Sequence, residues 1–388
     1  MLRPIPYARQ NISQNDIEKV VAVLKSDWLT QGPAIERFEG VVAEYCGARY
    51  AVAVSSATAA LHIACLAAGL KAGDLLWTSP NTFVASSNCG LYCGASVDFV
   101  DINKKSYNLS VNKLKEKIKL AEFTGKLPKV LIPVHFSGQS CEMSDIFKFV
   151  HNYGITVIED ASHALGASYQ NTRVGSCAYS DMAVFSFHPV KIITTGEGGM
   201  VLTNRKDLYE KLMRLRTHGI TRDPAFMEGK SHGPWYYQQI ELGFNYRMTD
   251  IQAALGVSQM GRLDEFVLRR NMLAERYNKA LENSPVILPW LHPDTYSASH
   301  LYVIRLKLDT IQKTHSQVFT ELRNGGIQVN LHYIPVHTQP FYKQLGFKES
   351  DFPEAENYYR EAISLPMYYD LTEKQQDYIV STLKKVLQ

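Results

Sequence analysis

The sequence predicts an α/β protein with a large domain built on a mostly parallel sheet, followed by a smaller α+β domain. Short, nearly continuous apolar runs alternate with helix-like segments through the first two thirds of the 388 residues, which is typical of strands covered by helices on both faces. The length suits two domains, and the pattern changes after a proline-containing loop at residues 284–293. We therefore expect a large domain over residues 1–265, a small domain over residues 266–388, and an N-terminal segment that packs on the small domain.

Strands are expected where a β-branched or apolar run is bounded by turn residues. In the large domain these runs are residues 50–56, 75–80, 96–101, 129–136, 155–160, 181–187 and 199–204. Apolar residues at helical spacing predict helices over residues 57–70 and 142–153 and one long helix over residues 249–283. In the small domain we expect extended segments at residues 300–308 and 327–335 and helices at residues 315–324 and 373–387.

Composition argues against several functional classes. The net charge of +3 is too small to indicate a nucleic-acid or membrane-surface partner. The basic run at residues 104–129 has leucines at helical spacing and is interpreted as a solvated helix face rather than a polyanion site. The six cysteines form no C-x-x-C pair and no metal-ligand pattern, and no stretch is typical of a signal peptide or a membrane span. We expect a cytoplasmic protein with reduced thiols and no metal site.

A first candidate for anion binding lies where a predicted strand ends at Ser55 and Ser56 and a helix of small residues begins at Ala57 or Thr58. Free backbone N–H groups and the helix dipole at such a start favour phosphate. Plain N-capping by Ser56 is the alternative. Neither G-x-G-x-x-G nor G-x-x-x-x-G-K-[ST] occurs in the chain, which argues against a nicotinamide oxidoreductase and against a P-loop nucleotide hydrolase.

Asp160 ends a predicted buried strand in "VIEDASHALGA", at the position where open α/β sheets bind ligands. A buried carboxylate needs a partner, which here could be a metal, an arginine or a protonated ring nitrogen. Capping of a following helix is the structural alternative.

Lys191 lies in "FSFHPVKIITTGEGGM", between a predicted strand that carries Ser186 and a glycine-rich turn. A desolvated pocket lowers the pKa of a lysine enough for it to act as a nucleophile, whereas an ordinary loop lysine is solvated. A helix-start phosphate site, a strand-end aspartate and a loop lysine are together the three groups that pyridoxal 5′-phosphate needs. Phe83 in "NTFVAS" could stack on the cofactor ring, with core packing as the alternative.

These motifs resemble those of the DegT/DnrJ/EryC1 group of sugar aminotransferases. The similar stretches are "SSATAALH", "NTFVAS", "EDASHALGA", "FSFHPVKIITTGEGGM", "RTHGI", "GFNYRMTDIQAALG" and "NLHYIPVHTQPFY", and the resemblance extends from Trp28 to Thr372. It implies a pyridoxal-phosphate-dependent transferase of fold type I that passes through the pyridoxamine form of its cofactor. Family members that dehydrate sugars have histidine in place of the lysine, so Lys191 favours amino transfer.

The resemblance implies a role for each residue around the cofactor ring. Lys191 would be the catalytic lysine that forms the Schiff base and moves the proton. Asp160 would pair with the ring nitrogen, and His163 would lie beside the ring hydroxyl. Phe83 and Ser162 would lie on opposite faces of the ring.

The same resemblance implies that the phosphate is held by Ala57, Thr58 and Ser186. Asn245 of "FNYRM" would come from the neighbouring subunit of a homodimer, and Arg247 would contact a carboxylate or a diphosphate. The alternative is that "FNYRM" is only a turn before a helix.

Within the family, the chain looks most like members that aminate C4 of UDP-linked 4-keto-6-deoxy-N-acetylhexosamines for pseudaminic acid, with L-glutamate as amino donor. "WLTQGP", "SHALGASYQNTRVGS" and "FSFHPVKIITT" carry this closer likeness, whereas Ile192-Ile193 departs from the Pro-Ile that such members tend to have. It implies a nucleotide-sugar pocket lined by Tyr7, Asp27, Trp28, Leu29, Thr30, Asn330, Leu331, His332 and Tyr333, each of which could instead be a turn or packing residue.

Two other interpretations stay open. The chain could act on another nucleotide-linked keto-sugar, such as a dTDP-sugar or a UDP-sugar for O-antigen or lipid A. It could also be a regulator that binds pyridoxal phosphate without turnover.

Overall fold

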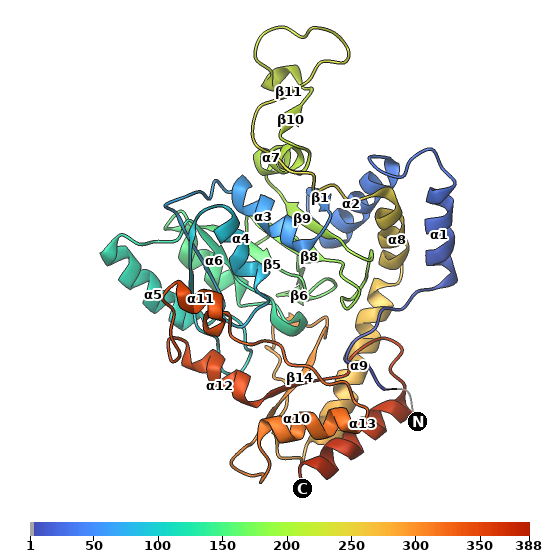
Figure 1. Cartoon of the computed structure of the whole chain (residues 1–388), viewed down its shortest axis with the longest axis vertical. Helices are drawn as coiled ribbons and strands as arrows, with labels where there is room; N and C mark the ends of the chain where they lie inside the picture. The colour runs from blue at the N-terminus through green and yellow to red at the C-terminus, as the bar shows by residue number, and fades with distance from the viewer. Residues whose placement is uncertain (1–3) are drawn as a thin grey trace.

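The computed structural model describes residues 4–388 and places a seven-stranded sheet in the larger part of the molecule (Figure 1). Its strands, in spatial order, are β1 (Tyr50–Val54), β9 (Gly199–Thr203), β8 (Met182–Ser186), β5 (Thr156–Asp160), β4 (Val130–Ile132), β2 (Leu75–Thr78) and β3 (Ser96–Phe99). The strands from β8 to β3 pair in parallel, and β9 runs antiparallel to both of its neighbours. The predicted α/β class with a mostly parallel sheet is confirmed.

Both faces of this sheet are buried, which explains why the strands read as continuous apolar runs. On one face Val52, Val54 and neighbouring strand residues share a core with α3 (Ala57–Ala67), α4 (Ala85–Tyr92) and α7 (Lys206–Arg216). On the other face Ala53 and Phe185 pack in a core that includes α2 (Pro33–Cys46) and α8 (Asp250–Met260). Near β2 and β4 that face is covered by α5 (Val111–Thr124) and α6 (Met143–His151).

Two predicted elements of the larger part differ from the structure. The strand expected at residues 129–136 covers only β4, because the chain then bends into a 3-10 turn, η1 (Phe136–Gly138). The single helix expected at residues 249–283 is two helices, α8 and α9 (Leu263–Leu281), with a break at Gly261 and Arg262.

The smaller part is built on an antiparallel sheet in the order β12 (Val286–Ile287), β14 (Tyr302–Leu306) and β15 (Ala362–Leu365). It also contains the helices α10 (His315–Asn324), α11 (Pro340–Gln344), α12 (Pro353–Glu361) and α13 (Glu373–Val386), and the 3-10 turn η3 (Val336–Thr338). The segment expected to be extended at residues 327–335 forms no strand and makes single bridges at Ile327, with Ile5, and at Asn330, with Ser364. The domain boundary near residue 265 stays a prediction, and α9 runs across it.

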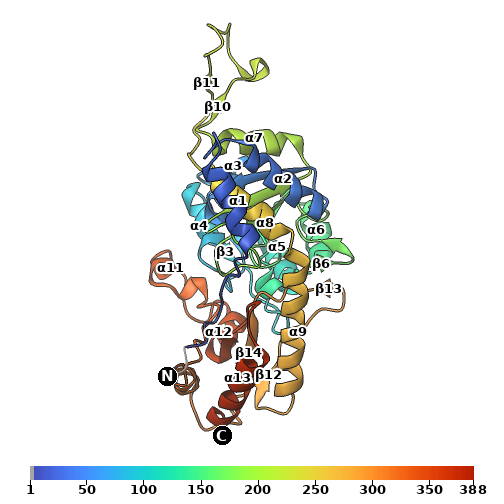
Figure 2. The same cartoon turned by 90° about the vertical axis from the view of Figure 1, so that its right-hand side faces the viewer.

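The remaining elements lie at the periphery. They are α1 (Gln14–Leu24), the 3-10 turn η2 (Pro224–Phe226), the three-stranded sheet β13 (Thr295–Tyr296), β6 (Ser168–Tyr169) and β7 (Thr172–Arg173), and the pair β10 (Ile220–Thr221) and β11 (Gln238–Gln239). Both views show β10 and β11 in an arm that projects from the body beyond α7 (Figures 1 and 2). None of the helices in residues 4–388 has the length and apolarity needed to span a bilayer.

Gly199, the first residue of β9, lies against the start of α3. A Cβ atom built there would lie 2.5 Å from the Ala57 nitrogen and from the Ser56 carbonyl group. We expect Gly199→Ala to lower the free energy of unfolding by about 1–3 kcal/mol, because backbone on both sides must move. Denaturant-induced unfolding measures this change.

Gly40→Ala is the matched control, because Gly40 lies within α2 and an added Cβ meets nothing within 4 Å. It should leave stability unchanged or raise it by about 0.5–1 kcal/mol. Equal stability of Gly199→Ala and the unmodified chain would refute the close approach.

Candidate active site

The candidate site lies where the carboxyl ends of β5 and β8 meet. Asp160 pairs with Val184 in the ladder and is only 6% exposed. Its carboxylate accepts a hydrogen bond from Ser86 Oγ at 2.6 Å and another from the Ser162 amide at 3.1 Å. No helix begins directly after Asp160, so the capping alternative is wrong. Each of the two carboxylate oxygens accepts one hydrogen bond from the protein.

Lys191 lies in the loop between β8 and β9, where its amide donates to the His188 carbonyl at 2.9 Å. Burial lowers the pKa of its ammonium group to about 8, although the Asp160 charge opposes this shift. An amine with this pKa is partly neutral near neutral pH, as a nucleophile or proton carrier requires. This lowered pKa favours the nucleophile interpretation over that of a solvated loop lysine.

The start of α3 combines capping with free donors. Ser56 accepts hydrogen bonds from the amides of Ala59, at its Oγ, and Ala60, at its carbonyl. Within residues 4–388 no acceptor contacts the amides of Ala57 and Thr58. Free N–H groups at a helix start suit a phosphate.

Ser186 and the glycine turn complete this corner. Ser186 is buried at the end of β8, opposite Gly199 in the ladder. Gly199 in turn touches the start of α3, so the loop that carries Lys191 passes beside the candidate phosphate site. Free amides, a strand-end hydroxyl, a carboxylate and a lysine form a donor set that fits pyridoxal phosphate.

His163 is buried, and its environment fixes its tautomer. The Ser137 amide donates to Nδ1 at 3.3 Å, so the ring proton lies on Nε2, which is 3.0 Å from the Tyr333 hydroxyl. Burial holds the pKa of His163 well below its usual value, and the nearby Lys191 and His332 lower it further. His163 is thus a neutral donor.

Phe83 is not a core residue, because its side chain is 60% exposed. Its ring centre lies 6.5 Å from that of Tyr333. An aromatic face left open beside a half-buried tyrosine can stack on a flat ligand. Ser162 is half-buried next to Asp160.

Part of the predicted sugar pocket lies at the same site. The rings of Tyr7 and His332 are 5.6 Å apart, and His332 Nδ1 lies 2.8 Å from Ser364 Oγ. Burial and the Lys191 charge lower the pKa of His332 to about 3. Burial raises the pKa of Tyr7, although a hydrogen bond with the Asn330 side chain opposes the shift.

The other predicted pocket residues lie elsewhere. Residues 27–30 are exposed, and Thr30 pairs with Thr249. Arg247 pairs with Val54, and Asn245 is exposed at the base of the β10–β11 arm. In the part of the chain that the structure describes, no hydrogen bond joins residues 27–30 to residues 330–333.

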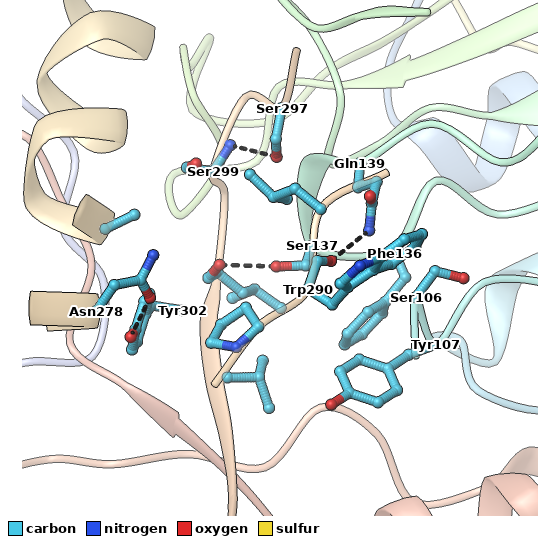
Figure 3. A pocket seen from close by; sticks show the side chains of 15 residues that line it. Ser106, Tyr107, Phe136, Ser137, Gln139, Asn278, Trp290, Ser297, Ser299 and Tyr302 are labelled. Carbon is cyan, nitrogen blue, oxygen red and sulfur yellow. Dashed lines mark hydrogen bonds between the residues drawn. The ribbon is translucent and has the colours of Figure 1, made fainter. Parts of the chain in front are cut away.

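A small cavity of about 50 Å³ lies between the two parts of the molecule (Figure 3). Phe136, Ser137, Trp290 and Tyr302 are among the residues that line it. A space of this size holds a few water molecules and not a nucleotide sugar. Its wall includes the Ser137 hydroxyl, which donates to the Leu301 carbonyl at 2.7 Å. Ser137 thus connects His163, to which its amide donates, with the smaller part of the molecule.

Two contacts at the site were not predicted from the sequence. Ser86 donates a hydrogen bond to Asp160. The signal that could have identified Ser86 is its spacing, four residues after Thr82 in a segment predicted to bind the ligand. Ser137 acts through its backbone amide, which no residue pattern reveals.

Comparison with known proteins gives consistent results. The chain matches the DegT/DnrJ/EryC1/StrS aminotransferase family over residues 10–384. It is 38% identical to the spore coat polysaccharide biosynthesis protein SpsC of Bacillus subtilis, over 99% of this chain and 97% of that protein. It is 37% identical to the UDP-4-amino-4,6-dideoxy-N-acetyl-beta-L-altrosamine transaminase of Campylobacter jejuni, over 99% of this chain and 98% of that protein.

Solved structures are similar over the whole chain. Helicobacter pylori PseC, an aminotransferase involved in the biosynthesis of pseudoaminic acid, superimposes with a TM-score of 0.90 at 29% identity and covers 99% of both chains. The Streptococcus pneumoniae protein Spr1654 in its PMP form gives a TM-score of 0.89 at 29% identity over 98% of both chains.

The lowered pKa of Lys191 predicts how its reactivity depends on pH. Reductive methylation of the cofactor-free chain with formaldehyde, followed by peptide mass analysis, should show Lys191 reacting faster as pH rises, with a midpoint of about 8. Only the neutral amine attacks, so the rate follows the deprotonated fraction. Asp160→Asn should move the midpoint to lower pH, because the charge that favours the protonated amine is gone. A midpoint that does not move in Asp160→Asn would contradict the electrostatic coupling of the two residues.

Proposed function

Because this chain belongs to the DegT/DnrJ/EryC1/StrS aminotransferase family, we propose that it transfers the amino group of L-glutamate to C4 of a UDP-linked 4-keto-6-deoxy-N-acetylhexosamine for pseudaminic acid. It is a pyridoxal-phosphate-dependent sugar aminotransferase. The observation that carries the finer proposal is full-length similarity to the Campylobacter transaminase and to PseC, together with a half-buried lysine of lowered pKa at position 191. Six free cysteines agree with a cytoplasmic enzyme.

Each residue of the site has a separate role in the proposed reaction. Bound pyridoxal phosphate supplies the electron sink for reactions at the carbon that bears the amino group. Lys191 binds the cofactor and, with its lowered pKa, accepts and returns a proton at Nζ. Asp160 would hold the ring nitrogen protonated, and neutral His163 would offer its Nε2 proton to the ring hydroxyl oxygen in place of the Tyr333 hydroxyl.

Two further groups fix the cofactor in place. The amides of Ala57 and Thr58, with the Ser186 hydroxyl, would bind the phosphate. Phe83 and Ser162 would lie on opposite faces of the ring. L-Glutamate reacts first and the keto-sugar second at this one site, whose sugar contacts include Tyr7 and residues 330–333.

The second candidate is an aminotransferase for another nucleotide-linked keto-sugar. The similarity to SpsC supports it, because SpsC is named for spore coat polysaccharide biosynthesis and is as similar to this chain as the Campylobacter enzyme.

We also propose a homodimer in which Asn245 completes the partner's site. The β10–β11 arm and the residues just after it carry exposed apolar side chains, among them Trp235, which is 73% exposed, and Leu242, which is 77% exposed. The arm projects from the body (Figure 2), so its own chain does not cover these side chains. A second copy of the chain would bury them.

A panel of UDP- and dTDP-linked keto-sugars tests the substrate. With L-glutamate, the yellow holoenzyme should bleach, release 2-oxoglutarate and convert the UDP-linked 4-keto-6-deoxy-N-acetylhexosamine to a 4-amino sugar, as measured by product mass. Lys191→Ala should lower turnover by at least about a thousandfold. Turnover of dTDP-sugars alone would favour the second candidate. If no sugar gives 2-oxoglutarate, the result would support the alternative that the chain binds pyridoxal phosphate without turnover.

Complementation tests the shared site. Lys191→Ala and Asn245→Ala homodimers should both be impaired, whereas a mixed dimer, purified through a different tag on each chain, should regain activity because one of its two sites is complete. If Asn245 serves the site of its own chain, the mixed dimer stays inactive.

A further inference from the structure

We infer that Ser86, supported by Thr82, is a positioning residue that orients the Asp160 carboxylate for the cofactor ring nitrogen. The inference rests on the cofactor class of the family and not on the proposed sugar. A chain that rejects every keto-sugar offered would therefore leave it standing.

The hydroxyl of Ser86 has one proton, and its surroundings decide where that proton goes. Ser86 Oγ lies 2.6 Å from Asp160 Oδ2, 2.7 Å from Thr82 Oγ1 and 3.3 Å from the Phe83 carbonyl. The carboxylate is the only charged acceptor of the three and is also the nearest, so it takes the proton. Thr82 must then donate to Ser86. The result is a relay that runs from Thr82 through Ser86 to Asp160.

This relay is dry. Ser86 is 0% exposed and Thr82 is 2% exposed, so water does not replace a missing donor without opening the structure. In such surroundings a hydrogen bond to a carboxylate is stronger than in water, and successive hydroxyls polarise one another. The Ser162 amide binds the other oxygen, Oδ1. The two donors approach from different segments and fix the rotation of the carboxyl group.

The relay also fixes the relation between two cofactor contacts. Thr82 and Ser86 flank Phe83, the exposed aromatic residue, at the start of α4. The same segment is held by Asn81, which accepts from the Tyr333 amide at 3.2 Å and donates to the Tyr107 carbonyl at 3.3 Å. A shift of α4 would move the stacking ring and the donor to Asp160 together.

The test pairs substitutions in the protein with a change in the ligand. The ligands are pyridoxal 5′-phosphate and 1-deazapyridoxal 5′-phosphate, which has carbon in place of the ring nitrogen, and binding to the full-length cofactor-free chain is followed by fluorescence. Ser86→Ala should weaken binding of pyridoxal phosphate by about tenfold, the effect of losing a hydrogen bond to a charged group. Its effect on the deaza analogue should be less than about twofold, because that ligand has no ring proton for Asp160 to hold.

Three variants serve as controls. Ser87→Ala removes an equally buried hydroxyl from the next position of α4, where Ser87 Oγ contacts Tyr342 at 2.6 Å and not Asp160, and it should leave both affinities unchanged. Ser86→Thr keeps the hydroxyl and should bind pyridoxal phosphate with the affinity of the unmodified chain. Thr82→Val should weaken binding of pyridoxal phosphate by about twofold to threefold, since it removes only the second member of the relay.

An equal loss for both ligands in Ser86→Ala would overturn the inference, because it would mean that Ser86 only maintains the fold. Binding of pyridoxal phosphate with unchanged affinity would overturn it as well. Denaturant-induced unfolding of Ser86→Ala and Ser87→Ala, measured without ligand, separates a loss of stability from a loss of ring contact.

Discussion

A lysine and an aspartate share one desolvated pocket, and the rest of the site depends on the balance between them. Burial favours the neutral amine of Lys191, whereas the Asp160 charge favours its protonated form, and the outcome is a pKa of about 8. Without burial the amine would be protonated and unreactive. Without Asp160 the ring nitrogen of the cofactor would have no anionic partner. The protein must therefore bury a carboxylate and still supply it with hydrogen bonds. The Ser86 hydroxyl and the Ser162 amide donate these bonds.

The sheet topology places the lysine in this pocket. Strand β8 ends at Ser186 and β9 begins at Gly199, and residues 187–198 between them contain no helix of the kind that a parallel crossover normally uses. Strand β9 consequently returns antiparallel, and the connecting loop folds over the carboxyl ends of β5 and β8. Gly199 permits the loop to end against the start of α3. One reversal of strand direction thus brings together the lysine, the strand-end aspartate and the candidate phosphate site.

The sequence was sufficient for the parts of the structure that short segments determine. Apolar runs predicted the strands, and Asp160, Lys191 and the start of α3 were predicted from strand-end and helix-start patterns. Periodicity did not separate α8 from α9, because apolar residues continue at helical spacing through the break at Gly261 and Arg262. Residues 327–335 were misjudged because their bridging partners, Ile5 and Ser364, come from distant segments. Ser137 could not be predicted, since its contact with His163 is made by a backbone amide.

The same distinction explains why the cofactor follows from the chain more readily than the sugar. Contacts to the cofactor come from segments that the central sheet brings to one edge, and the chemistry of the cofactor dictates their residue types. The predicted sugar contacts fall into two groups: Tyr7 and residues 330–333 lie beside His163, whereas residues 27–30 and Asn245 are exposed. If a second copy of the chain brings the exposed group to the pocket, sugar selection depends on how two subunits meet. Specificity would then vary through the subunit interface while the lysine and the buried aspartate stay unchanged.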